Sequence, residues 1–253
     1  MNKASEHKID VWDDSWSQWT VEEDLETCAD DDLLPILLKY LPKQGKVLEA
    51  GCGFGRWIIY LKNRGYTNII GIDNSPVALS KAKLFDPTLP LQMGDIRQLP
   101  FPDGYFKAYL SFGVIEHFIE GPAEALKEGY RVLEARGLLL VTVPCENVLR
   151  RIKKRLRPVK KLFKKAPSAP LPFFEYHYSR RYMEELLKRE KFEILFIRPV
   201  NHPFGLWYDL PFFRSKDRKY KINRTGRLIS RILRSLSPWF APHMILCVGR
   251  AKK

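Results

Sequence analysis

Short β-prone runs alternate with amphipathic helical stretches between residues 46 and 143, and this alternation constrains the fold more than any other feature. It is typical of βαβ units, in which a helix connects two parallel strands. There we expect strands at 46–50, 68–73, 89–93, 108–112 and 138–143, and helices at 56–63, 76–84 and 122–134. Later we expect helices at 180–190 and 225–236 and strands at 192–198 and 244–249. The predicted fold class is α/β, a doubly wound, seven-stranded, mostly parallel sheet.

The alternation stops after Pro144, where a basic, proline- and aromatic-rich stretch begins. Because 253 residues fit one domain of ordinary size, we interpret the irregular stretches as insertions after strands five and six. The expected organisation is an N-terminal segment with a first helix (1–44), a ligand-binding core (45–144), a basic insertion (145–178), and a C-terminal part of the same domain with a second insertion (179–253).

A glycine-rich turn, Gly51-Cys52-Gly53-Phe54-Gly55, connects the first expected strand to a helix. Glycine allows positive φ angles and brings bare backbone close to a ligand. The dinucleotide fingerprint would place its third glycine where Arg56 stands. Glu49 also precedes the turn, and a carboxylate repels a pyrophosphate but suits an ammonium or sulfonium group.

Two further acids follow the next two expected strands. Asp73 ends the second strand, where a carboxylate can accept hydrogen bonds from both ribose hydroxyls, and Asp95 follows the third, where it can accept from an adenine amino group. One acid therefore lies at the carboxyl edge after each of three successive strands. Each acid alone reads equally well as a helix cap, but the set predicts a nucleoside site.

These motifs resemble those of class I S-adenosylmethionine-dependent methyltransferases, a Rossmann-like family, and are most similar to the type 11 subgroup acting on small molecules, quinones and lipids. The resemblance rests on Val47 to Arg56, 71–73, 94–96 and 99–104. It implies that S-adenosylmethionine is the cofactor and that its binding residues are Glu49, Gly51, Cys52, Gly53, Gly55, Asp73, Asn74, Asp95, Ile96 and Phe112. Lys107 departs from the family's usual aspartate, which we expect to affect only a local turn.

Methyl transfer needs orientation, desolvation and, for some acceptors, a base. His117 follows the fourth strand and is the candidate catalytic base, although a packing or capping role for His117 and Glu116 is the simpler reading. The chain has Ser111-Phe112-Gly113-Val114 where nucleic-acid amino methyltransferases carry an Asn/Asp-Pro-Pro-aromatic motif, and it lacks the glutamate pair of arginine methyltransferases. We expect a neutral or oxygen-bearing small-molecule or lipid-linked acceptor.

The formal net charge of +14 is concentrated outside the core, in residues 150–165 and 214–234. Both stretches carry apolar residues at helical spacing among Lys and Arg, a pattern that fits an anionic membrane surface or a helix packed on the domain. RNA phosphates could attract the same charges, so an RNA methyltransferase is one alternative, and a SAM-binding regulatory protein without turnover is another. We favour the membrane over nucleic acid as a partner.

Four separated cysteines without a Cys-x-x-Cys pair favour neither a disulfide framework nor a zinc site, and we expect no metal. The first residues are polar and acidic, so we expect a cytoplasmic protein, peripheral to the membrane if it binds one. Trp12, Trp16 and Trp19 resemble the lid that closes over the cofactor in related enzymes, or else pack on the first helix.

Overall fold

The computed structural model describes residues 12–161, 174–216 and 221–253. Part of the predicted basic insertion, residues 162–173, and four residues of the second basic stretch lie outside the described residues. Among those described, no helix combines the length and apolar composition needed to cross a membrane.

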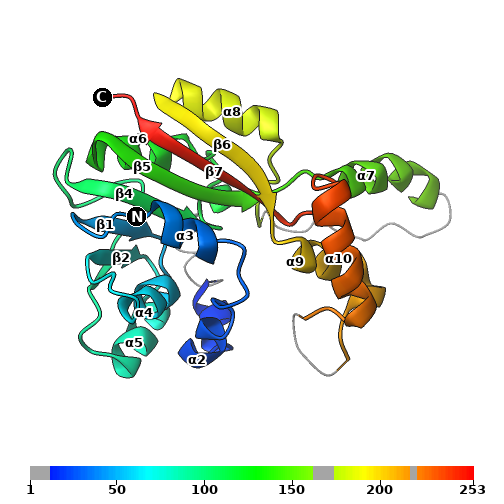
Figure 1. Cartoon of the computed structure of the whole chain (residues 1–253), viewed down its shortest axis with the longest axis horizontal. Coiled ribbons are helices and arrows are strands. Elements are labelled where there is room, and N and C mark those ends of the chain that lie inside the picture. The colour runs from blue at the N-terminus through cyan, green and yellow to red at the C-terminus, as the bar shows by residue number, and fades with distance from the viewer. Residues whose placement is uncertain (1–11, 162–173, 217–220) are drawn as a thin grey trace.

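Seven strands form one sheet in the order β3-β2-β1-β4-β5-β7-β6 (Figure 1). Strands β1 to β5 pair in parallel, whereas β7 is antiparallel to both of its neighbours. The strands are β1 (Val47–Ala50), β2 (Ile69–Asp73), β3 (Leu91–Met93), β4 (Phe106–Phe112), β5 (Leu133–Pro144), β6 (Phe192–Val200) and β7 (Met244–Ala251). The predicted fold class is confirmed.

Helices cover both faces of the sheet. One core cluster joins β1 and β2 to α3 (Leu34–Tyr40), α4 (Arg56–Lys62) and α5 (Pro76–Phe85). The other joins β4, β5 and β7 to α6 (Ala123–Val132) and α8 (Arg180–Arg189). Residues 12–17 are also helical and precede α2 (Val21–Leu25), which begins with a capping box between Thr20 and Glu23.

Three helices form a lobe beside the sheet, which we call the helical lobe: α7 (Val148–Lys161), α9 (His202–Asp209) and α10 (Arg224–Leu236) (Figure 1). Two short 3₁₀ turns, Ile115–His117 and Pro211–Phe213, complete the structure. The lobe has its own small core around Leu206, Phe213, Ile222 and Ala241. It follows β5 and β6, where the insertions were predicted.

Two expectations about local structure were wrong. The predicted helix at 122–134 ends at Val132, because the chain turns directly into β5 and passes through positive φ at Arg136. The proline- and aromatic-rich stretch after β6, expected to be irregular, contains helix α9. Pro203 stands in its first turn, where a missing N–H leaves no intrahelical bond unmade.

Candidate active site

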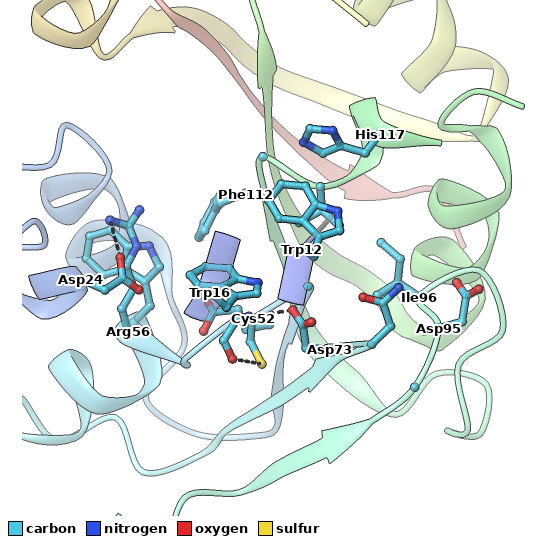
Figure 2. Close-up of a pocket in the computed structure, with 18 of the residues that line it drawn as sticks. Trp12, Trp16, Asp24, Cys52, Arg56, Asp73, Asp95, Ile96, Phe112 and His117 are labelled. Atoms are coloured by element: carbon cyan, nitrogen blue, oxygen red, sulfur yellow. Dashed lines mark hydrogen bonds and ion pairs between the residues drawn. The ribbon is translucent and has the colours of Figure 1, made fainter. Parts of the chain in front are cut away.

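The carboxyl ends of β1, β2 and β4 border a cavity of about 390 Å³. It is lined by most of the predicted cofactor residues, namely Glu49, Gly51, Cys52, Gly53, Asp73, Asn74, Asp95, Ile96 and Phe112, and also by His117. In Figure 2, Asp24 and Arg56 lie at one end of the cavity and Asp95 at the other, with Asp73 between them. The structure therefore brings these predicted residues together, and Gly55 starts α4 just behind them.

The glycine loop takes its shape from three left-handed residues. Gly51, Gly53 and Gly55 have φ of +78°, +54° and +73°, which side chains with a Cβ rarely adopt. The amides of Gly51 and Cys52 donate to the carbonyl of Ile72, and the amide of Gly55 donates to the carbonyl of Cys52. Since these donors are already used, the loop does not offer the row of amides that holds a pyrophosphate.

Asp73 is held rigidly at the end of β2. Its Oδ2 accepts from the amide of Gly53 at 2.7 Å, and its Oδ1 accepts from the amide of Ser75 at 2.9 Å. Burial raises the pKa of Asp73 above its usual value, and these backbone bonds oppose the rise. A carboxylate has about four acceptor sites, so both oxygens keep capacity for the hydroxyls of a ribose.

Glu49 is a buried acid of the cavity lining with one unsatisfied oxygen. It is 4% exposed, and no group of the described residues hydrogen-bonds its Oε2. Burial raises its pKa to about 8, although Arg56 acts in the opposite direction. The backbone amide of Ile58 also favours the ionised form, but a buried carboxylate oxygen without a hydrogen bond is costly, so a cationic ligand group here would stabilise that form further.

Several lining residues were missed in the sequence, among them a polar cluster around Arg56. Arg56 forms ion pairs with Asp24 at 3.9 Å and with Asp31 at 3.1 Å, and Thr27 accepts a hydrogen bond from its guanidinium. The cavity end near Glu49, where the methionine part of the cofactor is expected, is lined by Asp24, Thr27 and Arg56. The two acids come from the N-terminal segment, far from the glycine loop in the sequence. The one local signal was the position of Arg56 directly after Gly55, which places a cation beside the loop.

Asp95 lines the cavity, but Arg97 engages its carboxylate. The guanidinium donates to Oδ2 at 2.6 Å from Nη2 and to both oxygens from Nε, which lowers the pKa of Asp95 against the effect of burial. Its role toward adenine remains a prediction. Lys107, in contrast, lies at the amino end of β4, where its stem packs on Gly45, away from the cavity.

The N-terminal cover, residues 12–19, lies over the cavity. Trp16 packs against Phe54 at 4.7 Å between ring centroids, and Trp12 meets His117 edge-on at 4.7 Å (Figure 2). Lys81 on α5 donates to the carbonyls of Trp16, Ser17 and Trp19 at 2.8–2.9 Å. The tryptophans thus line the cavity as a lid would.

His117 is 8% exposed and ends the 3₁₀ turn after β4. Its Nδ1 is 2.8 Å from the carbonyl oxygen of Phe174, and its Nε2 is 3.9 Å from Oε1 of Glu116. The ring borders the cavity, so both the catalytic and the packing reading are compatible with its place.

A cavity whose open carboxylate oxygen suits a cation, and whose loop amides at Gly51, Cys52, Gly53 and Gly55 are already used, disfavours a dinucleotide and fits a sulfonium nucleoside. In a sheet of this strand order, those properties define the class of protein: the class I S-adenosylmethionine-dependent methyltransferases. The residues present fit the cofactor, since Glu49 offers an unpaired oxygen and Asp73 offers spare acceptor sites.

Comparison with known proteins defines the family. Residues 48–141 match the model of the methyltransferase domain family. The chain is 34% identical over 115 residues to 2-methyl-6-phytyl-1,4-hydroquinone methyltransferase of Arabidopsis thaliana. The aligned region covers 44% of this chain and 33% of that enzyme. The chain is also 32% identical over 114 residues to the human eEF1A lysine and N-terminal methyltransferase, covering 43% and 16%. Residues 48–141 therefore match a methyltransferase domain, in agreement with the fold and the cavity.

Solved structures show the same fold over most of the chain. A SAM-dependent methyltransferase from Methanosarcina mazei superposes with a TM-score of 0.60 at 18% identity, covering 87% of this chain and 98% of that one. Geranyl diphosphate C-methyltransferase from Streptomyces coelicolor gives a TM-score of 0.57 at 14% identity, covering 90% and 78%. The chain spans only 56%, 33% and 16% of three curated relatives, including one from Mycolicibacterium smegmatis.

Proposed function

We propose that the chain transfers a methyl group from S-adenosylmethionine to a small-molecule or lipid-linked acceptor at an anionic membrane surface. The observation that carries the methyl-transfer part is the cavity in which Oε2 of Glu49 is buried without a hydrogen-bond partner among the described residues, beside the fixed carboxylate of Asp73. When bound, the cofactor supplies a methyl group already activated by positive sulfur.

The chain's own residues then bind, orient and exclude water. Glu49 faces the ammonium of the methionine part, and Asp73 accepts from the ribose hydroxyls. Trp12 and Trp16 cover the cavity and keep out solvent, which strengthens these interactions. His117 borders the acceptor side, where its ring can take the proton of a hydroxyl acceptor.

Calorimetry with S-adenosylmethionine tests the cofactor site. We expect binding to the wild type and at least a tenfold loss in Asp73→Ala, while Asp30→Ala, an exposed aspartate outside the cavity, binds normally. Mass spectrometry of extract metabolites and lipids then identifies the acceptor by the gain of one methyl group. A gain that persists in Asp73→Ala, or wild-type protein that gives no binding heat, would contradict this assignment, and binding without turnover would favour a regulatory role.

The membrane part is supported by α10, whose sequence holds four arginines and no acid. One face packs in the helical lobe through Ile229 and Leu233. The adjacent, solvent-facing side presents Leu228, Ile232 and Leu236, which are 59%, 46% and 81% exposed. Their i, i+4, i+8 spacing gives one continuous apolar stripe.

Exposed arginines flank this stripe, namely Arg224, Arg227 and Arg231. On α7, Ile152 and Leu156 are also exposed among basic residues. Each basic residue near an anionic bilayer contributes roughly 1 kcal/mol, and the apolar side chains insert at the headgroup boundary. RNA would use the arginines but leave the leucines in water, so the apolar stripe favours a bilayer.

Co-sedimentation with vesicles of phosphatidylglycerol and phosphatidylcholine separates these partners. We expect Leu228→Ser with Leu236→Ser to weaken vesicle binding severalfold, whereas Leu84→Ser, an equally exposed leucine on α5, has no effect. Unchanged vesicle binding in the double variant, or salt-sensitive gel shifts on RNA without vesicle affinity, would contradict the membrane proposal.

A further inference from the structure

Two segments far apart in the sequence bring three ligand-type side chains together beside the cofactor cavity. Glu116 and His117 come from the turn after β4, and Glu175 comes from the connection before α8. The amide of Tyr176 donates to the carbonyl of Glu116 at 3.0 Å, which fixes the two segments side by side. One ligand atom from each side chain lies within 4.8 Å of the other two.

Glu116 is the group that the fold and the methyl transfer leave unexplained. It is 1% exposed, and its Oε2 has no hydrogen-bond partner among the described residues. A buried carboxyl with an open oxygen is destabilising unless it keeps a proton or contacts a cation. Here the nearest groups include a second carboxylate, Glu175, so the cluster concentrates negative charge.

The orientation of His117 is the one found in metal-binding histidines. Its Nδ1 hydrogen-bonds the carbonyl of Phe174, and a carbonyl only accepts, so Nδ1 carries the proton. Nε2 therefore keeps its lone pair and lies on the side of Glu116. Metal-ligating histidines usually donate their other N–H to a carbonyl or carboxylate in this way.

We propose that Glu116, His117 and Glu175 bind a divalent transition-metal cation such as Zn²⁺ or Mn²⁺. One imidazole nitrogen and two carboxylates form a donor set that suits such ions and leaves positions open. One oxygen of Glu175 is 2.8 Å from Nε2 of His177, which would orient that ligand from outside. The absence of cysteine ligands explains why cysteine spacing did not reveal the site.

The cluster lies between two cavities, which suggests what the open positions hold. His117 lines the cofactor cavity, and Tyr176 and His177 line a second cavity with Ile119 and Glu146. This step rests on the proposed function but replaces the base role of His117 with a ligand role. A hydroxyl acceptor bound to the cation would lose its proton to solvent water. Its oxygen would form the bond to the methyl carbon as the sulfur–carbon bond breaks and S-adenosylhomocysteine leaves.

Cobalt binding to the EDTA-treated full chain tests the site without any turnover. We expect one equivalent of Co²⁺ to produce visible absorption bands that excess Zn²⁺ abolishes, and Zn²⁺ calorimetry to give the same stoichiometry. His117→Ala and Glu116→Gln should weaken binding at least tenfold. Glu120→Gln, a nearby exposed acid outside the cluster, should bind as the wild type does.

Glu175→Gln keeps the test decisive if Glu116→Gln fails to fold, because Glu175 is partly exposed and its loss leaves the core intact. The proposal is overturned if no stoichiometric cation binds, or if binding persists in His117→Ala and Glu175→Gln. S-adenosylmethionine calorimetry on the same samples separates the two proposals. Normal cofactor binding without cation binding rejects only the metal site, in which case Glu116 is a buried protonated acid.

Discussion

We expect the buried carboxyl of Glu49 to make cofactor binding depend on pH. Burial raises its pKa to about 8, so the side chain is mostly protonated near pH 6 in the free protein. An ammonium group beside it favours the ionised form and lowers that pKa, so binding releases a proton. Affinity for S-adenosylmethionine should therefore rise as pH rises toward the free-protein pKa.

The magnitude follows from the two titrations. With a pKa of about 8, Glu49 is ionised in roughly 1% of molecules at about pH 6 and in roughly 25% at about pH 7.5. Over the same range, an α-amino group with a pKa of about 7.8 loses roughly a third of its charged form. The product predicts an affinity gain of roughly 15-fold, equivalent to about 1.6 kcal/mol.

Isothermal titration calorimetry at these two pH values, in buffers of different ionisation heat, measures both the affinity and the proton released. Glu49→Gln is the matched variant, because the amide keeps the shape but does not titrate. We expect its affinity to be low and nearly independent of pH. A wild-type affinity that is flat or falls between the two pH values would refute the reasoning, as would proton release that persists in Glu49→Gln.

Two further predictions concern contacts that the sequence did not reveal. Lys81→Ala removes three hydrogen bonds to the N-terminal cover, so it should weaken cofactor binding roughly 3- to 10-fold and change the tryptophan fluorescence. Lys83 lies on the same helix but does not contact the cover, so Lys83→Ala should leave both the binding and the fluorescence unchanged. Asp209→Ala leaves the buried guanidinium of Arg150 unpaired and should lower the free energy of unfolding in urea by about 3–5 kcal/mol. Glu193→Ala, which breaks an exposed ion pair with Arg136, should cost about 1 kcal/mol or less, and equal losses in both variants would contradict the burial argument.

The core could be predicted because its signals are local. Residues 47–50 are apolar or buried and lead directly into three glycines with positive φ, so the strand, turn and helix follow from adjacent residues. Asp73 was predictable because it ends an apolar strand and its carboxylate caps the next turn. Such features depend on neighbours in the chain, which a sequence displays.

The remainder depends on contacts between distant residues. Helix α9 forms where proline and aromatic residues suggested irregular chain, because Gly205 allows the helix to approach the backbone of Ala241 and Pro242, where a Cβ would have no room. Lys81 and Glu175 gain their places only after the chain has folded, since their partners are more than 50 residues away. No local pattern marks such residues.

The direction of the last three strands has a consequence for how such proteins diversify. Strand β7 runs antiparallel to β5 and β6, so β5 and β6 end, and β7 begins, on the same side of the sheet as the glycine loop. Apart from α8 and β6, the residues between Pro144 and Met244 therefore belong to connections at this one edge of the sheet, which we call the rim. Exchanging these connections between homologues would change the surfaces at this rim and in the helical lobe, while the residues that line the cavity, all before residue 119, would stay the same.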